Sequence, residues 1–177
     1  AEGKQIGTSL CETKLTDLIE KIKFEAEKFN CKIHLPLDVV CAAELKKNMP
    51  TSIYNSHECP TNKMILDVGP KTIADISMIF NSCKTLIWNG PLGAFEITPF
   101  NKATNRVAQI AATLTKENKL ISIAGGGDTV SALNYANVAS DFSYISNAGG
   151  AFLEWMEGKK LPGIMALEAS AKNMQRF

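Results

Sequence analysis

The chain has 177 residues, of which 45% are hydrophobic and 21% charged, and its formal net charge is +1. This composition is typical of a globular domain with a sizeable core, and the near-neutral charge excludes the strong field that would attract nucleic acid or an acidic membrane surface. No apolar run approaches the roughly 20 residues of a membrane span, and the first ten residues lack the pattern of a signal peptide.

The cysteines and histidines indicate no built metal centre. Five cysteines, an odd number without C-x-x-C spacing, indicate reduced thiols in a cytoplasmic protein. His57 and Cys59 in HECP are two possible metal ligands, but without a second pair a plain loop is the favoured interpretation. We expect His34 and His57 to be structural.

The first third of the chain predicts a helix, a strand and a loop. Apolar residues at helical spacing predict a helix over 13–29. The run KIHLPLDVVCAAE follows and predicts an irregular or edge strand, because it contains Pro36. Residues 46–62 are polar and contain two prolines, so we expect an excursion loop there.

The rest of the chain alternates between short apolar runs and helical patterns. The predicted strands are MILDVGP, KTLIWNGP, LISIAGGG and FSYISNAGG. Helices are expected over about 71–81, behind Thr98 as N-cap and Pro99 as first helical residue, in DTVSALNYA and in AFLEWMEG. This alternation predicts an α/β fold with a parallel sheet and helices as crossovers, without a linker that would mark a second domain.

Three predicted strands end in glycine-rich turns, at 88–93, 124–129 and 147–150. In a parallel sheet of this kind, ligands bind at the carboxyl ends of the strands. Glycine lets the backbone approach a ligand, and the first amides of the next helix attract an anion such as phosphate. Asp128 beside one turn suits Mg²⁺ on a nucleotide; the alternatives are an ordinary tight turn and a helix N-cap.

Two common phosphate-binding signatures are missing from the sequence. There is no G-x-x-x-x-G-K-[ST], so a P-loop NTPase is excluded. There is also no G-x-G-x-x-G with an acidic residue about 20 positions on, which disfavours a dinucleotide-binding fold.

Four motifs occur in an order and spacing that resemble a known family. They are LDVGPKT (66–72), WNGPLGAFE (88–96), AGGGDTVSAL (124–133) and SNAGGAFLEWMEGKKLPGI (146–164). From about Ile6 to Leu167 the chain resembles the carboxyl-terminal, nucleotide-binding half of phosphoglycerate kinase. The resemblance implies a Rossmann-like three-layer parallel sheet with helices on both faces. It also implies reversible phosphoryl transfer between Mg·ATP and the carboxylate of 3-phosphoglycerate, a step of glycolysis.

By matched position, the resemblance implies a role for eleven residues. Asp128 would hold Mg²⁺, directly or through water. The amides of Gly126, Gly127 and Thr129 would lie along the phosphates of ATP or ADP, with Asn89 beside them. Glu96 would accept hydrogen bonds from the ribose hydroxyls. The migrating phosphoryl group would face Gly149 and Gly150, with Gly127 and Gly150 as the residues assigned to catalysis, and the adenine slot would be lined by Leu66, Pro91 and Ala94.

The sequence also departs from the family. Ala148 stands where a glycine is usual, and Ile65 where a small residue is common beside the adenine slot. Residues 1–177 match only part of the nucleotide-binding domain, and the amino-terminal domain that would bind 3-phosphoglycerate is absent. We therefore expect the isolated chain to be inactive, and the full-length enzyme to be a monomer.

Two other functions are compatible with the same glycine-rich turns. One is a stand-alone nucleotide-binding module without catalytic activity. The other is an oxidoreductase that uses a dinucleotide, for which NAD would bind more tightly than Mg·ADP.

Overall fold

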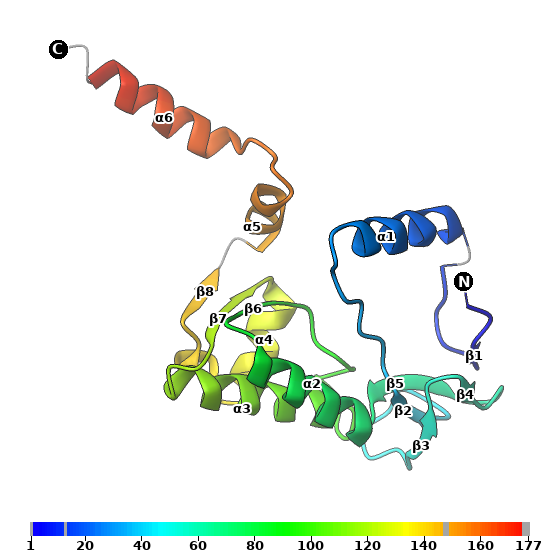
Figure 1. The fold of residues 1–177 in the computed structure, drawn as a ribbon. Helices are drawn as coiled ribbons and strands as arrows, with labels where there is room; N and C mark the ends of the chain where they lie inside the picture. The colour runs from blue at the N-terminus through cyan, green and yellow to red at the C-terminus, as the bar shows by residue number, and fades with distance from the viewer. Residues whose placement is uncertain (1, 13, 147–148, 175–177) are drawn as a thin grey trace.

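The computed structural model describes residues 2–12, 14–146 and 149–174, and its elements are drawn in Figure 1. The strands are β1 (Gln5–Ile6), β2 (Asp38–Ala42), β3 (Ser52–Asn55), β4 (Glu58–Cys59), β5 (Met64–Val68), β6 (Thr85–Asn89), β7 (Ile121–Gly125) and β8 (Tyr144–Ser146). The helices are α1 (Thr16–Lys28), α2 (Pro70–Ser82), α3 (Lys102–Lys116), α4 (Gly127–Tyr135), α5 (Gly149–Met156) and α6 (Pro162–Met174), with a 3₁₀ turn at Ala139–Asp141.

Among the described residues the strands form a three-stranded parallel sheet, a three-stranded antiparallel sheet and a two-stranded parallel pair. β6, β7 and β8 pair in parallel in that order, and α3, α4 and α5 all contact the central strand β7. This half confirms the predicted α/β class. β2 pairs antiparallel with β3 and with β5, and β1 pairs with β4. The expectation that the strands of 38–42 and 64–68 belong to the same parallel sheet is therefore wrong.

The predicted loop over 46–62 was wrong, because part of it forms β3 and β4. The run Ser52–Asn55 contains a β-branched and an aromatic residue, which suit a strand, and it pairs with residues 38–41 of β2. The Lys63 ammonium secures this hairpin by donating to the Ser52 hydroxyl and to the Tyr54 hydroxyl, each at 3.0 Å. Pro50 and Pro60 do not interrupt this pairing, because both lie outside the strands.

Helix α3 begins later than predicted. Thr98 and Pro99 lie in a turn joined by a cis peptide bond, and the helix begins at Lys102 behind Asn101. No side chain at Asn101 caps the helix; instead the Asp67 carboxylate, from β5, accepts a hydrogen bond from the Ala103 amide at 3.0 Å. A carboxylate distant in sequence therefore sets the helix start, which a search for a local cap does not find.

A second buried carboxylate binds the first amides of α2. Asp38, in β2, accepts from the amides of Lys71 (3.0 Å) and Thr72 (2.8 Å) and from the Thr72 hydroxyl (2.8 Å). Burial raises the pKa of Asp38, but these hydrogen bonds outweigh burial and leave it below its ordinary value of 3.8. The Thr72 hydroxyl also receives the Leu37 and Asp38 amides, so one network joins β2 to α2.

Asp67 is equally buried, but its pKa moves the other way. Both Asp38 and Asp67 are 2% exposed, and Asp67 faces Val40 of the neighbouring strand β2. Burial raises the pKa of Asp67 to about 6, and the two amides that donate to it, those of Ala103 and Val68, offset burial only in part. Asp38 and Asp67, in the neighbouring strands β2 and β5, therefore bind the first amides of α2 and α3, Asp38 with a lowered pKa and Asp67 with a raised pKa.

The main core lies between the parallel sheet and its helices. It contains Trp88, Val107, Leu133 and Phe142 with a run of alanines from α3, and the Trp88 ring lies 6.2 Å from that of Phe142. The small side chains of α3 let this helix approach β7 closely. A separate small cluster of Val39, Cys41 and Cys59 supports the antiparallel sheet.

Helices α1 and α6 stand apart from this core in Figure 1. No residue of α1 is buried, and its apolar side chains Leu18, Ile22 and Phe24 are about half exposed or more. An apolar cleft of about 540 Å³ separates α1 from β2 and is lined in part by Ile19, Ile22 and Val39. In the part of the chain that the structure describes, no helix is long and apolar enough to cross a membrane.

Replacing each buried carboxylate by its amide should change the pH dependence of stability in opposite ways. Asp38 has a lowered pKa, so its contribution is present above about pH 4 and is lost as the pH falls further. Asp38→Asn should lower the free energy of unfolding by about 1–3 kcal/mol at pH 7 and less at pH 3. Asp67 has a raised pKa, so the wild type should lose stability as the pH rises from about 4 to 6, and Asp67→Asn should remove that loss.

Urea denaturation of wild type and both variants between pH 3 and pH 8 measures these effects. Asp17→Asn on the exposed helix α1 is the matched control and should leave the pH profile unchanged. If Asp67→Asn retains the wild-type decline between pH 4 and 6, the assigned ionisation of Asp67 is wrong.

Candidate functional site

The pairing of the parallel sheet brings the ends of three strands together. Asn89, the last residue of β6, pairs with Gly125 of β7, and Gly125 pairs with Ser146 of β8. The glycine-rich turns that follow these strands therefore begin at one edge of the sheet. We call residues 125–129 with 149–150 the glycine cradle.

Backbone contact joins the second and third turns. A Cβ atom at Gly149 would overlap the backbone of Gly126, including its amide nitrogen, so only glycine fits at 149. Gly126 itself has φ = +95°, a conformation that side-chain-bearing residues rarely adopt, and it is the residue before α4. Two helix N-termini, those of α4 and α5, consequently lie next to each other.

Asn89 and Thr129 connect the first turn to the cradle. A Cβ at Gly126 would lie 3.3 Å from the Asn89 side-chain oxygen, so this amide group borders the Gly126 backbone. The Gly90 amide donates to the buried Thr129 hydroxyl at 2.7 Å, and the Trp88 indole nitrogen donates to the Gly90 carbonyl at 2.6 Å. The Gly90 turn is thereby fixed to helix α4.

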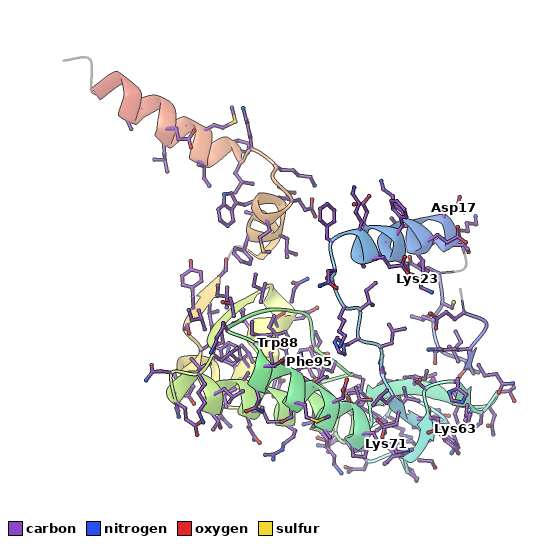
Figure 2. The ribbon with its side chains drawn as sticks, in the orientation of Figure 1. Asp17, Lys23, Lys63, Lys71, Trp88 and Phe95 are labelled. Carbon is purple, nitrogen blue, oxygen red and sulfur yellow. The ribbon has the colours of Figure 1, made fainter. Side chains whose placement is uncertain are left out.

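The loop of residues 90–97 is held from the other side by β5. The Ala94 amide donates to the Leu66 carbonyl at 2.9 Å, which brings these two predicted adenine-slot residues together. Asp67 leaves no room for a Cβ at Gly93, and the Thr104 hydroxyl accepts from the Leu92 amide at 3.1 Å. Figure 2 labels Phe95 on this loop and Lys63 in the antiparallel half, and the Phe95 ring lies 5.9 Å from that of Tyr135 in α4.

Asp128 lies in the first turn of α4 with its side chain exposed, and Gly126 is the N-cap residue. The alternative of Asp128 as N-cap is therefore wrong, because Gly126 occupies that position. Glu96 is exposed and Pro91 is half-buried on the 90–97 loop. A Cβ at Gly127 or at Gly150 would meet no atom within 4 Å, so both glycines border open space. Ala148 lies outside the described residues.

Three residues that the sequence analysis did not single out prove to hold the site. Asp67, Thr104 and Trp88 position the loop and the turn, although the sequence analysis gave none of them a role. An acidic residue inside the apolar run MILDV was a usable signal for Asp67, because an isolated buried carboxylate needs hydrogen-bond partners. Thr104 in the middle of an ordinary helical pattern carried no such signal.

The arrangement can bind an anion chiefly through backbone groups. The first amides of α4 and α5 have no partner within their helices, and both helix dipoles present a positive end to the cradle. No cluster of three or more His, Cys, Asp or Glu that could hold a metal occurs among the described residues. His57 and His34 lie instead beside carboxylates, Glu58 at 3.4 Å and Asp75 at 3.6 Å.

Comparison with known proteins shows which family the chain resembles. The family described as phosphoglycerate kinase matches residues 1–159. The phosphoglycerate kinases of Zymomonas mobilis and of Jannaschia sp. are 59% and 58% identical to the chain, each match covering 96% of this chain and 43% of the relative. The chain thus spans less than half the length of these relatives.

Two solved structures have the same fold. The phosphoglycerate kinase of Coxiella burnetii superposes with a TM-score of 0.87 and 40% identity, over 97% of this chain and 43% of that one. The enzyme of Pyrococcus horikoshii, at 23% identity and a TM-score of 0.70 over 89% of this chain and 38% of that one, shares the fold. These likenesses confirm the Rossmann-like three-layer class. With residues 1–159 matched and a glycine cradle at the carboxyl ends of β6, β7 and β8, the chain belongs to the phosphoglycerate kinase family.

Proposed function

We propose that residues 1–177 are part of the carboxyl-terminal, nucleotide-binding domain of a two-domain phosphoglycerate kinase. The parent enzyme transfers a phosphoryl group reversibly between Mg·ATP and the carboxylate of 3-phosphoglycerate, in the cytoplasm and as a step of glycolysis. The observation that carries the proposal is the backbone contact of Gly149 with Gly126, which sets two helix N-termini side by side. The family match supports it.

In this proposal the glycine cradle binds the phosphates of ATP or ADP. The amides of Gly126, Gly127 and Thr129 line the phosphate chain, and Asn89 lies beside it. Gly127 borders open space, so a phosphate oxygen can approach its backbone closely. Gly149 and Gly150 face the transferring phosphoryl group, and Gly127 and Gly150 act on it through their amides.

Asp128 fits a magnesium site that is completed by the nucleotide. It is one exposed carboxylate at a helix N-terminus, and the described residues contain no cluster of metal-ligating side chains. Mg²⁺ commonly takes one or two carboxylates, several waters and substrate phosphates, so a single acid is sufficient here. When bound, Mg²⁺ neutralises charge on the phosphates, and Asp128 holds it directly or through water.

The 90–97 loop is proposed to bind the nucleoside. Glu96 is exposed and accepts from the ribose hydroxyls, while Leu66, Pro91 and Ala94 line the adenine slot. The hydrogen bond from the Ala94 amide to the Leu66 carbonyl fixes two of these three relative to each other. Asp67 and Thr104 are positioning residues for the loop, since they contact its backbone and not the nucleotide.

The chemistry needs positioning and charge neutralisation more than proton transfer. A substrate carboxylate is already ionised at neutral pH, so its attack on phosphorus requires no general base. The spreading negative charge of a loose phosphoryl-transfer transition state is stabilised by fixed amides and a metal. This explains how a site built of glycine backbone can serve a kinase without a catalytic histidine.

Substrate binding is assigned to the remainder of the parent protein. The relatives are more than twice as long as the matched region, and 3-phosphoglycerate would be held by their amino-terminal domain. The full-length protein is proposed to act as a monomer. The names of the relatives favour this kinase over a stand-alone nucleotide-binding module.

Asp128→Asn should weaken binding of Mg·ADP about tenfold or more, because the variant loses the charge that holds the metal. Binding of ADP in excess EDTA should change much less. Isothermal titration calorimetry on wild type and variant, with and without Mg²⁺, measures both. Asp17→Asn on α1 is the matched control with the same chemical change and should bind as wild type does. An equal loss for ADP with and without Mg²⁺ would remove the metal role.

Gly149→Ala and Gly150→Ala should differ sharply in stability. A Cβ at 149 would overlap the Gly126 backbone, so Gly149→Ala should lower the free energy of unfolding by about 2 kcal/mol or more. A Cβ at 150 meets open space, and alanine suits a helix, so Gly150→Ala should be neutral or slightly stabilising. Thermal denaturation followed by circular dichroism compares them; similar losses in both variants would contradict the proposed contact.

The isolated 177-residue chain should bind Mg·ADP but catalyse no phosphoryl transfer, because the proposed partner domain for 3-phosphoglycerate is outside it. A coupled assay for release of ADP from ATP and 3-phosphoglycerate tests this, with a full-length family member as positive control. Measurable turnover by the chain alone would refute the two-domain assignment.

A further inference from the structure

Cys41 and Cys59 form a pair of buried thiols away from the glycine cradle. Cys41 lies in β2 and Cys59 in β4, both side chains are 0% exposed, and their sulfur atoms are 3.4 Å apart. The Cys41 thiol donates to the Cys59 sulfur, and no disulfide joins them. The other three cysteines, Cys11, Cys31 and Cys83, are exposed or half-buried.

The surroundings of the pair are closed and mostly apolar. Val39, Tyr54 and Ile65 pack around the two thiols. The Cys59 thiol lies 3.6 Å from the Lys63 carbonyl and 3.7 Å from the Pro60 carbonyl, both hydrogen-bond acceptors for it. Burial raises the pKa of Cys41 to about 12, so this thiol stays protonated at neutral pH. The pair is thus a stable dithiol in the absence of an oxidant.

The geometry leaves only a short movement between dithiol and disulfide. A disulfide bond is about 2.0 Å long, so the sulfurs must approach each other by roughly 1.4 Å. The register of β2 against β5 shifts between Val40 and Cys41, so the backbone beside Cys41 is already irregular there.

We propose that Cys41 and Cys59 are an oxidative modification site, which a small peroxide converts into a disulfide. The Cys59 sulfur attacks a peroxide oxygen and becomes a sulfenic acid, while its thiol proton leaves with the displaced oxygen as water. The second thiol then attacks the sulfenic sulfur, forms the S–S bond and releases water. The sum is two thiols and one hydrogen peroxide giving one disulfide and two waters; both sulfurs are oxidised and the peroxide is reduced.

The bond would add a covalent link between strands that are now joined by hydrogen bonds and packing. β2 belongs to the antiparallel sheet and β4 pairs with β1, so the disulfide would link the two sheets. It would also close a loop from 41 to 59 that contains all of β3. Closing such a loop restricts the unfolded chain, so the oxidised form should be the more stable one. This inference does not depend on the proposed kinase function.

The test uses a variant in which only this pair remains, with Cys11→Ser, Cys31→Ser and Cys83→Ala. Alanine is chosen at 83 because that side chain packs against the main core. After incubation of the folded variant with millimolar hydrogen peroxide, we expect the titratable thiols to fall from two to zero. Intact mass should fall by about 2 Da, as two hydrogens are lost, and dithiothreitol should reverse both changes. The urea midpoint of the oxidised form should be higher.

Three observations complete the test. In wild type, which keeps all five cysteines, a non-reducing peptide map should link the Cys41 and Cys59 peptides even if the triple variant folds poorly. A control that adds Cys41→Ser to the triple variant should show no loss of 2 Da. The proposal is overturned if folded protein does not react, if it gains oxygen atoms without losing 2 Da, or if it forms only intermolecular dimers.

Discussion

The buried carboxylate of Asp67 is the interaction on which the arrangement of the site depends. Its strand, β5, belongs to the antiparallel sheet, while the amide it binds, that of Ala103, begins the helix that packs against the parallel sheet. The same carboxylate occupies the space beside Gly93, so it also fixes the loop with the proposed nucleoside residues. One side chain thus couples both sheets to the site. Its raised pKa reflects the cost of burying a charge for that purpose.

The candidate site consists mainly of backbone groups, so the sequence needs to provide the right backbone conformation more than particular side chains. In the proposed site, amides supply the anion-binding groups, so few side chains are needed in contact with a phosphate. What the sequence must instead provide is the absence of a side chain at Gly149 and a permissive φ at Gly126. Thr129 and Asn89 then connect the turns to each other. The geometry of the site therefore depends largely on positions that carry no side chain, chiefly Gly126 and Gly149.

Local sequence patterns correctly predicted helix α2 and the strands of the parallel sheet. The helix expected over 71–81 is α2 at Pro70–Ser82, and the strands LISIAGGG and KTLIWNGP became neighbouring parallel strands. The turn at 124–129 lies between β7 and α4 as predicted, whereas a longer loop separates the turn at 88–93 from helix α3. Their meeting at one edge followed from the expected parallel sheet.

The errors share one physical cause, which is contact between residues distant in sequence. β3 is a strand because it pairs with β2, and α3 begins at Lys102 because Asp67 reaches it from β5. The antiparallel direction of β2 and β5 is likewise decided by pairing across some twenty-five residues. In the site, Thr104 acts from helix α3 through a hydrogen bond to the loop backbone, which no local motif encodes. Only the lone acid in MILDV hinted at such a contact.

The order β6–β7–β8 leaves β6 as an outer strand, with Ile87 40% exposed and, among the described residues, no neighbour on its far side. A bare row of main-chain donors and acceptors is a template on which a further strand can assemble. Together with the uncovered apolar side chains of α1, it makes the chain in isolation prone to polydispersity and precipitation at high concentration. A polypeptide that paired with the outer edge of β6 would therefore reduce aggregation without changing the chemistry of the site.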